Sequence, residues 1–443
     1  MALAQRRFFH LCRRFSSSPA TSVPLLWSPA GEENGGQSTV EILSWGRGGS
    51  GQLGGGKEEI RFYPVPVASL RLPPSFRLSP SYGRLYRQDA VESGDGSAIE
   101  VDISCGLFHS SLLVDGRFWI WGKGEGGRLG FGHEIPVFVP TLNPNLEEVR
   151  CVALGGIHST ALTRSGELFT WGYGGFGALG HYVNHRELLP RVVEGTWMGK
   201  ISHVATSGAH TAAITDSGEL YTWGRDQGDG RLGLGGGGGP GEGGSFATPS
   251  RVSALPVPVA AASCGGFFTM ALTAEGQLWS WGANSNYELG RGDSTADWRP
   301  KPIPSLQDTR VVQIASGGYH SLALTDKGEV LSWGHGRQGQ LGHSSTQVQK
   351  VPTVIEALSQ EHIVYIACGG SSSAAVTDKG VLYMWGNAQD NQLGVPGLSG
   401  MQTSPVQVKF LMDDKRLGSH RVLSVSVGAS HAMCLVLRQS DDL

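Results

Sequence analysis

Seven Trp-Gly dipeptides recur along the chain, and they restrict the folds that it can adopt. The gaps between successive dipeptides are 76, 50, 52, 58, 52 and 52 residues, and Leu-Gly follows each tryptophan eight or nine residues later. A period close to fifty residues indicates a repeat architecture built from one structural unit. The tryptophans are Trp45, Trp121, Trp171, Trp223, Trp281, Trp333 and Trp385.

One repeat contains the pattern of a small antiparallel sheet. Residues 311–342 hold three short apolar or alternating runs separated by glycine-rich turns, and a fourth run follows Pro352. Strands of four to eight residues without a long helical period predict a four-stranded sheet. Such a sheet cannot bury both faces alone, but seven packed radially can. The fold class is therefore all-β, a seven-bladed β-propeller of four-stranded blades.

The ends of the repeat region predict how the ring closes. The repeats open at EILSWG, residues 41–46, and finish at SHAMCLVL, residues 430–437. These segments are two halves of one interrupted unit, so pairing of the N- and C-terminal strands would leave no open edge. We place the propeller at 37–438, with an insert at about 70–98 where one repeat is longer than the others, and a tail at 439–443.

Residues 1–36 differ from the rest and are interpreted as a mitochondrial transit peptide and linker. Four arginines occur before Ser16, and no acidic residue precedes Glu32. An Arg-rich, Ser-rich, acid-free amphipathic segment is typical of an organellar transit peptide. We expect import into the mitochondrion, to the matrix, with removal of the leader near Ser16. A disordered basic tail is the alternative. The arginines are Arg6, Arg7, Arg13 and Arg14.

Composition limits the possible classes of function. Charged residues make up 16% of the chain and the net charge is −3, which excludes the strongly basic character of proteins held on DNA by charge. Any nucleic-acid contact must be local. No apolar run approaches the ~18 residues that span a bilayer, so we expect no membrane insertion.

Several apparent catalytic or ligand motifs belong to the repeat itself. Gly-x-Gly-x-x-Gly follows Trp-Gly without a helix, which argues against a nucleotide site. His-Ser pairs recur around the ring, which favours hydrogen bonds between blades over catalysis. The six cysteines form no Cys-x-x-Cys pair, so they are interpreted as buried strand thiols. We expect no catalytic residue, no metal and no cofactor.

The segment from Gly317 to Gly342, GGYHSLALTDKGEVLSWGHGRQGQLG, resembles the repeat of the regulator-of-chromosome-condensation family. That family includes a nuclear guanine-nucleotide exchange factor, the plant UV-B photoreceptor and organellar members linked to RNA processing. No blade has tryptophan directly before the histidine position, which argues against photoreception. The chain is most like a plant mitochondrial member involved in organellar RNA processing.

The resemblance implies a non-enzymatic mitochondrial scaffold that supports processing or intron splicing of transcripts for respiratory-chain subunits. Its partners would be mitochondrial RNA-processing proteins and single-stranded RNA. The alternative is a guanine-nucleotide exchange factor for a small GTPase. Fold alone does not choose between these functions.

Two groups of residues are candidates for partner binding. The first surrounds the insert, where arginines alternate with aromatic residues in a pattern suited to phosphate contact and base stacking; the alternative is a solvated loop. The second directly follows the Trp-Gly dipeptides, where equivalent blades place cations on one face; the alternative is ordinary turn residues. The first group is Arg61, Arg71, Arg77, Arg84, Arg87, Tyr82 and Tyr86, and the second is Arg47, Lys123, Arg225 and His335, with Arg337 close by.

Overall fold

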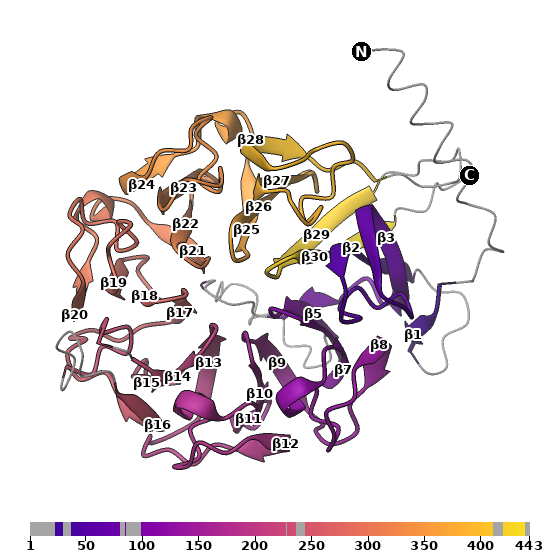
Figure 1. Ribbon diagram of the computed structural model, residues 1–443, viewed down its shortest axis with the longest axis horizontal. Coiled ribbons are helices and arrows are strands. Elements are labelled where there is room, and N and C mark those ends of the chain that lie inside the picture. Colours follow the sequence, from indigo (N-terminus) through magenta and orange to yellow (C-terminus); the bar gives the residue numbers. More distant parts are fainter. Residues whose placement is uncertain are drawn as a thin grey trace.

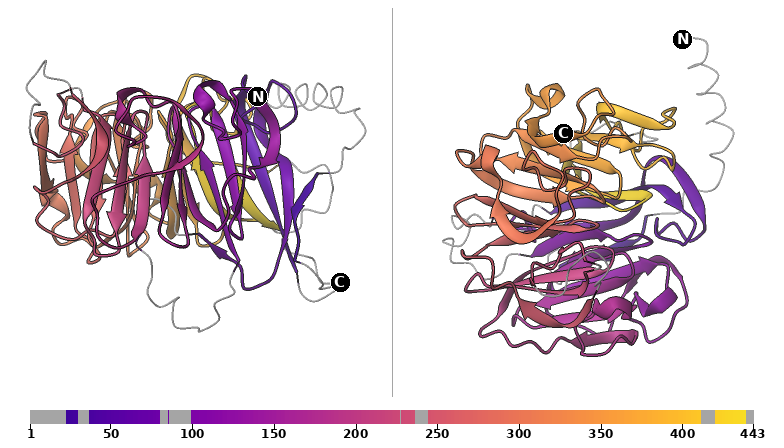
Figure 2. Two further views of the ribbon diagram at one scale, coloured as in Figure 1. Left: turned by 90° about the horizontal axis from the view of Figure 1, so that it is seen from below. Right: turned by 60° about the vertical axis from the view of Figure 1, so that its left-hand side comes forward.

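The protein is a ring of seven antiparallel sheets arranged around a central channel, as the computed structural model shows (Figure 1). The structure describes residues 23–29, 37–79, 85, 99–226, 228–235, 244–410 and 420–438. The ring is a flat disc, and its strands run from one face of the disc to the other (Figure 2). The prediction of a seven-bladed β-propeller is confirmed.

Six blades are formed from four strands that are consecutive in sequence. Blade 1 is β5 (Glu100–Cys105), β6 (His109–Val114), β7 (Arg117–Gly122) and β8 (Val137–Leu142); blade 2 is β9 (Val149–Leu154), β10 (His158–Thr163), β11 (Leu168–Gly172) and β12 (Glu187–Val192); blade 3 is β13 (Ile201–Thr206), β14 (His210–Thr215), β15 (Leu220–Arg225) and β16 (Ser245–Arg251). Blade 4 is β17 (Ala261–Cys264), β18 (Phe268–Leu272), β19 (Leu278–Gly282) and β20 (Asp297–Pro302); blade 5 is β21 (Val311–Ser316), β22 (His320–Thr325), β23 (Val330–Gly334) and β24 (Gln349–Val354); blade 6 is β25 (Ile363–Cys368), β26 (Ser372–Thr377), β27 (Leu382–Asn387) and β28 (Met401–Gln407). Short 3-10 turns are η2 (Glu125–Gly127), η3 (Gly175–Gly177), η4 (Pro304–Leu306) and η5 (Glu356–Leu358).

Blade 7 combines the two ends of the propeller. The C-terminal strands β29 (His420–Val427) and β30 (His431–Arg438) form its inner half, and β2 (Ser38–Gly48) and β3 (Glu59–Leu72) form its outer half. β30 pairs antiparallel with β2, with Leu435 opposite Ile42 and Ala432 opposite Trp45. The predicted pairing of EILSWG with SHAMCLVL is therefore confirmed.

Two short strands extend the blades beyond the predicted four. β1 (Leu25–Trp27) pairs parallel with β3, and the partly buried Leu26 and Trp27 pack against the core. The segment interpreted as linker thus contributes a strand to blade 7. β4 (Arg77–Leu78) pairs parallel with β5, the innermost strand of blade 1.

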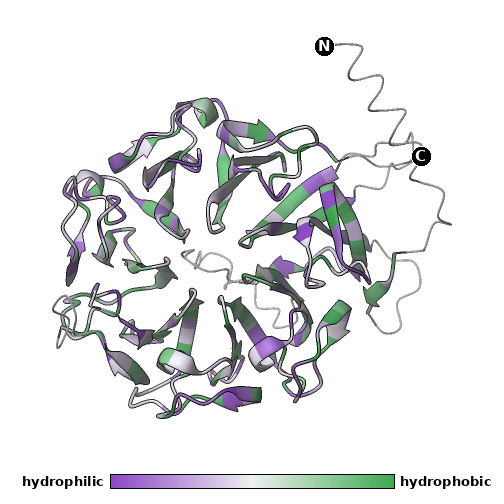
Figure 3. Ribbon diagram, viewed as in Figure 1, coloured by the Kyte–Doolittle hydropathy of each residue, from purple (hydrophilic) through white to green (hydrophobic). Residues whose placement is uncertain are grey.

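The hydrophobic core lies between neighbouring blades, and all seven tryptophans of the Trp-Gly dipeptides are fully buried in it. Phe118 of blade 1 packs against Trp171 of blade 2, with ring centroids 5.8 Å apart. Hydrophobic residues accordingly occur in every blade around the ring (Figure 3). Because a buried tryptophan lies at each interface, every blade is stabilised by packing against its two neighbours, and together the blades form a rigid disc.

The outermost strand of a blade begins before the repeated proline, and not after it as the sequence pattern predicts. β24 begins at Gln349, three residues before Pro352, and Pro140 likewise lies inside β8. Proline lacks an amide hydrogen, so it is tolerated in a strand with one unpaired edge. These prolines mark the rim of the disc.

Candidate functional site

The two faces of the disc carry different parts of the chain. In blade 1, β7 runs from Arg117 to Gly122, so the Trp-Gly turn lies at one face and the turn at Asp115 and Gly116 at the other. We call the first the Trp-Gly face. β4 pairs with β5 at Glu100 and Val101, the end far from the Trp-Gly turn. We call this second face the insert face.

Glycine is required at the Trp-Gly turn because another chain segment passes very close. Gly122 has a φ of 113°, and a Cβ atom there would lie 2.5 Å from the carbonyl oxygen of Phe108. The next amide, of Lys123, donates a hydrogen bond of 2.9 Å to that oxygen. The turn therefore holds the residue after Trp-Gly beside the residue that precedes the histidine position.

The same backbone hydrogen bond occurs in all seven blades and brings one pair of residues from each blade to the Trp-Gly face. These pairs are Arg47 with Ser430, Lys123 with Phe108, Tyr173 with Ile157, Arg225 with Ala209, Ala283 with Phe267, His335 with Tyr319, and Asn387 with Ser371. The predicted second group of residues therefore lies on one face.

The recurring histidines join neighbouring blades. His109 Nε2 lies 2.9 Å from Ser159 Oγ of the next blade, and Ser159 Oγ donates a 2.8 Å hydrogen bond to the Arg128 carbonyl. The hydroxyl oxygen is thus left to accept from Nε2–H. The predicted hydrogen bonding between blades is confirmed. Equivalent contacts are made by His158, His210, His320 and His431.

Burial keeps these five histidines neutral, and we call them the histidine clamps because they join neighbouring blades. Desolvation lowers the pKa of His158 and of His431 to about 4, and it lowers the pKa of His109 well below its ordinary value. The Nδ1 atoms of these three residues are buried without a hydrogen-bond partner. These histidines are fully buried structural residues, so they have no access to a substrate from solvent.

Acidic neighbours accompany two of the predicted cations on the Trp-Gly face. Arg47 lies 3.5 Å from Asp390, and Lys123 forms an ion pair with Glu125. These carboxylates offset the positive charge that a phosphate would otherwise meet. Both cations are exposed, so the pairs are worth little for stability.

The other predicted residues of this face adjoin aromatic rings. The Arg225 guanidinium lies 4.2 Å from the centre of the Phe176 ring. His335 lies beside Tyr319, with ring centroids 6.2 Å apart, and burial followed by the charge of Arg337 lowers its pKa. His335 is therefore a neutral neighbour of the arginine at neutral pH. Sequence reasoning missed the contact of Arg225 with Phe176 because it joins two different blades.

The structure corrects the assignment of Arg61 to a binding surface. The Arg61 side chain is only 9% exposed, and its guanidinium pairs with Glu59 at 2.6 Å. It also donates a 2.8 Å hydrogen bond to Ser44 Oγ. Ile60 and Phe62 on either side of Arg61 are exposed, so Arg61 lies on the opposite, buried side of β3.

The remaining insert candidates lie away from the Trp-Gly face or outside the described residues. Arg71 is exposed near the end of β3, and half-buried Arg77 belongs to β4. Leu85 donates its amide to the Val312 carbonyl at 2.9 Å, so the chain reaches blade 5. Arg84, Arg87, Tyr82 and Tyr86 fall outside the described residues. Arg71 pairs with Thr39 and Arg77 pairs with Glu100, so these two described residues lie at the insert face, away from the second candidate group.

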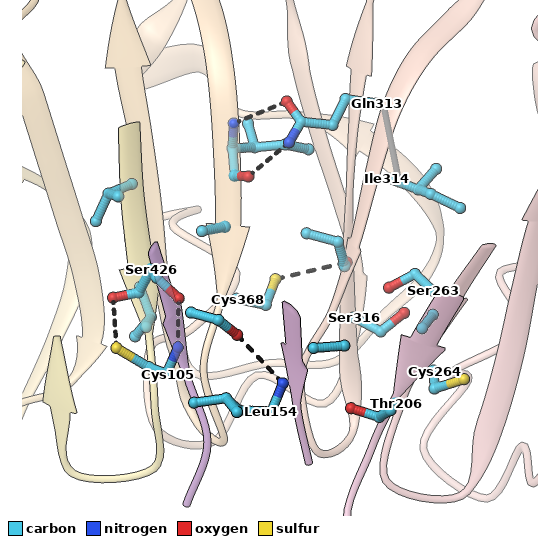
Figure 4. A pocket seen from close by; sticks show the side chains of 18 of the residues that line it. Cys105, Leu154, Thr206, Ser263, Cys264, Gln313, Ile314, Ser316, Cys368 and Ser426 are labelled. Atoms are coloured by element: carbon cyan, nitrogen blue, oxygen red, sulfur yellow. Dashed lines mark hydrogen bonds between the residues drawn. The ribbon is translucent and has the colours of Figure 1, made fainter. Parts of the chain in front are cut away.

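A cavity of about 140 Å³ occupies the central channel and is lined by the innermost strands (Figure 4). Cys105, Cys264 and Cys368 line it at equivalent positions of three blades. The Cys105 amide donates to Ser426 Oγ, and its thiol contacts the Ser426 carbonyl oxygen at 3.5 Å. Burial raises the pKa of Cys105 to about 12, so its reactive thiolate is scarce.

The described residues contain no group of three metal-ligating side chains, and their five cysteines are unbridged. The same part of the chain contains no helix long and apolar enough to cross a membrane.

Comparison with known proteins places this architecture in a family. The model of the RCC1-like domain matches residues 41–434. The Arabidopsis thaliana RCC1 domain-containing protein RUG3, mitochondrial, is 60% identical over 99% of this chain and 100% of its own length. The Arabidopsis thaliana ultraviolet-B receptor UVR8 is 32% identical over 76% of this chain and 75% of its own.

Solved structures share the fold. Yeast RCC1 (Prp20), in a structure with Kap60, superposes with a TM-score of 0.74 at 21% identity, covering 91% of this chain and 90% of that one. Human WBSCR16 gives a TM-score of 0.71 at 24% identity, covering 90% of this chain and all of the other. With the family model spanning nearly the whole propeller, the chain belongs to the RCC1-like domain family.

Proposed function

We propose that this protein is a non-enzymatic mitochondrial scaffold that supports the processing of organellar transcripts. Within that role we propose intron splicing of transcripts for respiratory-chain subunits, and hence biogenesis of respiratory complex I. The observation that carries the proposal is the 60% identity, over nearly the whole chain, to RUG3, a relative that is named as a mitochondrial protein. The four-arginine, acid-free leader supports a location in the matrix.

The chemistry of the interior supports a role without catalysis. A catalytic group is needed once, whereas the histidine and hydroxyl pairs recur around the ring and hold blades together. Burial raises the pKa of the channel thiol of Cys264 as well, which disfavours a nucleophile there. The exposed side chains of a rigid disc are suited to holding partners, which we propose are RNA-processing proteins and single-stranded RNA.

The proposal is tested by removing the protein from mitochondria and measuring the ratio of unspliced to spliced RNA for each intron. We expect the ratio to rise for a subset of introns and to return to normal when the full chain is restored. A variant with Arg6, Arg7, Arg13 and Arg14 changed to Glu should not restore it, because the leader would no longer direct import. Unchanged ratios for every intron would contradict the proposed function.

Guanine-nucleotide exchange is the other outcome that this test can reveal. The purified mature protein would then accelerate GDP release from a mitochondrial GTPase, while splicing in the depleted mitochondria stayed normal. That combination would replace the scaffold proposal with exchange activity. If the purified protein leaves the rate of GDP release unchanged and splicing is defective in the depleted mitochondria, the scaffold proposal is supported.

A further inference from the structure

Two groups of stacked side chains lie on the Trp-Gly face, one over blades 3 to 5 and the other over blades 2 and 3. In the first, Arg231 of blade 3 lies 4.6 Å from the ring centre of Phe267 in blade 4. Tyr319 of blade 5 stacks on Phe267, with centroids 5.3 Å apart and planes inclined by 22°. The three side chains form a column that crosses two blade interfaces. Its outer end is the Tyr319 ring, which is 41% exposed.

The column is fixed from below. Arg231 is buried and paired with Asp229, and its guanidinium donates a 3.0 Å hydrogen bond to the Gly266 carbonyl. This bond holds the turn that carries Phe267. A planar partner could therefore extend the column on Tyr319 without first ordering the rings beneath it, which favours binding.

The second group joins Tyr173 and Phe176 of blade 2 to Arg225 of blade 3. The two rings meet edge to face with centroids 6.5 Å apart, and Arg225 covers Phe176 at 4.2 Å. Tyr173 is 44% exposed and Phe176 is 38% exposed. We call the two groups, together with the nearby Arg337, the aromatic strip. Its residues are Tyr173, Phe176, Arg225, Arg231, Phe267, Tyr319 and Arg337.

Phe176 has a strained backbone conformation, although its ring is partly exposed. Its φ is 64°, a left-handed conformation that disfavours a bulky side chain. The corresponding residues five after the tryptophan in blades 1 and 3 are glycines, Gly126 and Gly228, each with a φ of 76°. Strain kept at an exposed residue points to a use of that side chain beyond folding.

Charge is distributed unevenly around the same face. Arg225 and Arg337 have no carboxylate within ion-pair distance in the described part of the chain, whereas Arg47 and Lys123 do. Arg337 is exposed and acts electrostatically on His335, which contacts Tyr319. Each stacked group is thus accompanied by one cation that is free to meet an anion.

We propose that the aromatic strip binds single-stranded RNA, with bases stacking on Tyr319 and on the Tyr173 and Phe176 rings and phosphates meeting Arg337 and Arg225. Exposed rings interleaved with uncompensated arginines match a chain of alternating planar bases and phosphates. The bases of a duplex are already stacked on one another, so single strands are favoured. This inference rests on the proposed role in transcript processing and names the ligand of the surface.

The test measures binding of a fluorescent twelve-nucleotide single-stranded RNA by the purified full-length mature protein, using fluorescence anisotropy over a range of salt concentrations. We expect Tyr319→Ala to weaken binding by about fivefold to a hundredfold, the range for loss of one stacked base. Arg337→Gln should flatten the salt dependence by about 0.7 in log–log slope, whereas Arg337→Lys should retain it.

Phe176→Gly separates binding from folding. Glycine removes the unfavourable left-handed conformation, so the melting temperature should stay the same or rise while RNA affinity falls. Matched controls are Phe62→Ala, which removes an exposed ring from the rim strand β3, and Arg117→Gln, which removes an arginine from the insert face. Both should bind RNA within about twofold of the unaltered protein.

Failure of this inference can be told apart from failure of the proposed function. The aromatic strip is overturned as an RNA site if the folded protein does not bind RNA. It is also overturned if Tyr319→Ala and Arg337→Gln bind RNA as tightly as the unaltered protein does. A dimer that Tyr319→Ala dissociates overturns it as well, since the strip would then contact a second copy. In each case the splicing ratios still decide the scaffold role on their own.

Discussion

The two faces of the disc are built by different means. On the Trp-Gly face, one backbone hydrogen bond and one glycine turn recur in all seven blades, and each displays a pair of side chains at an equivalent place. On the insert face, the chain between β3 and β5 departs from the repeat and reaches blade 5 at Leu85. The repeat thus makes the backbone of one face regular, and the side chains at these equivalent places differ from blade to blade and give that face its chemistry.

The largest effect is expected from opening the ring, because both faces depend on it. Deleting residues 421–443 removes β30 and nearly all of β29 and leaves β2 without its partner. We expect loss of cooperative unfolding, an effect far above the ~1 kcal/mol of a typical point mutation. Thermal unfolding followed by circular dichroism measures this. A truncated protein that melts cooperatively at an unchanged temperature would contradict the seven-blade closure.

The histidine clamps next to the Trp-Gly face should contribute strongly to stability. His158→Ala leaves a cavity at a fully buried site and removes the contact with Thr211 Oγ1, so we expect a loss of about 2–4 kcal/mol in the free energy of unfolding. The control is His185→Ala, an exposed histidine that should change stability by less than about 0.5 kcal/mol. If urea unfolding shows the same small loss of stability for His158→Ala as for His185→Ala, the His158 clamp contributes nothing to stability.

The clamps should also make stability depend on pH. A histidine titrates near 6.5 in the unfolded chain, but burial lowers the pKa of His158 in the folded protein to about 4. Its stabilising contribution is therefore complete above about pH 6.5 and is lost as the pH falls toward 4. Asp102, whose pKa burial raises to about 8, acts in the opposite sense. The measured slope is a net effect of several groups.

A variant isolates the contribution of one clamp. His158→Gln should reduce the fall in unfolding free energy between pH 6.5 and 4 by up to ~1.4 kcal/mol per pH unit relative to the unaltered protein. Urea unfolding at several pH values measures the difference. Identical slopes would mean that His158 is not buried as a neutral ring.

The smallest effect is expected from the arginines in and next to the insert. Replacing Arg71, at the exposed end of β3, and Arg77, Arg84 and Arg87 of the insert by Ser should change the free energy of unfolding little. If the aromatic strip is the RNA site, affinity for the twelve-nucleotide RNA should stay within about twofold. A large fall in affinity, with a salt slope flattened by about 0.7 per lost contact, would move the site to the insert.

The repeated features of the fold could be predicted from the sequence. The Trp-Gly spacing predicted seven blades, and the split repeat predicted that residues 41–46 pair with residues 430–437. The recurrence of His-Ser pairs also predicted contacts between blades, such as His109 with Ser159. These predictions succeeded because each rests on the same local interaction occurring several times.

Features that occur once were harder to predict. β1 is a three-residue run with no counterpart in the other blades, and its partner β3 lies more than forty residues away. Arg61 is buried and contacts Glu59 and Ser44, which the run of arginines and aromatic residues in the sequence does not reveal. The stacking of Tyr319 on Phe267 depends on the distance between blades 4 and 5, so it became visible only in three dimensions.

The central claim, that the Trp-Gly face and not the insert face meets RNA, is tested most directly by ultraviolet crosslinking. Single-stranded RNA would be crosslinked to the purified full-length mature protein, and the crosslinked peptides identified by mass spectrometry. Aromatic residues that can react occur on the Trp-Gly face and in the sequence of the insert, which includes Tyr82 and Tyr86. We predict crosslinks at Tyr319 and at Tyr173 or Phe176. Crosslinks confined to residues 73–98 would contradict the account.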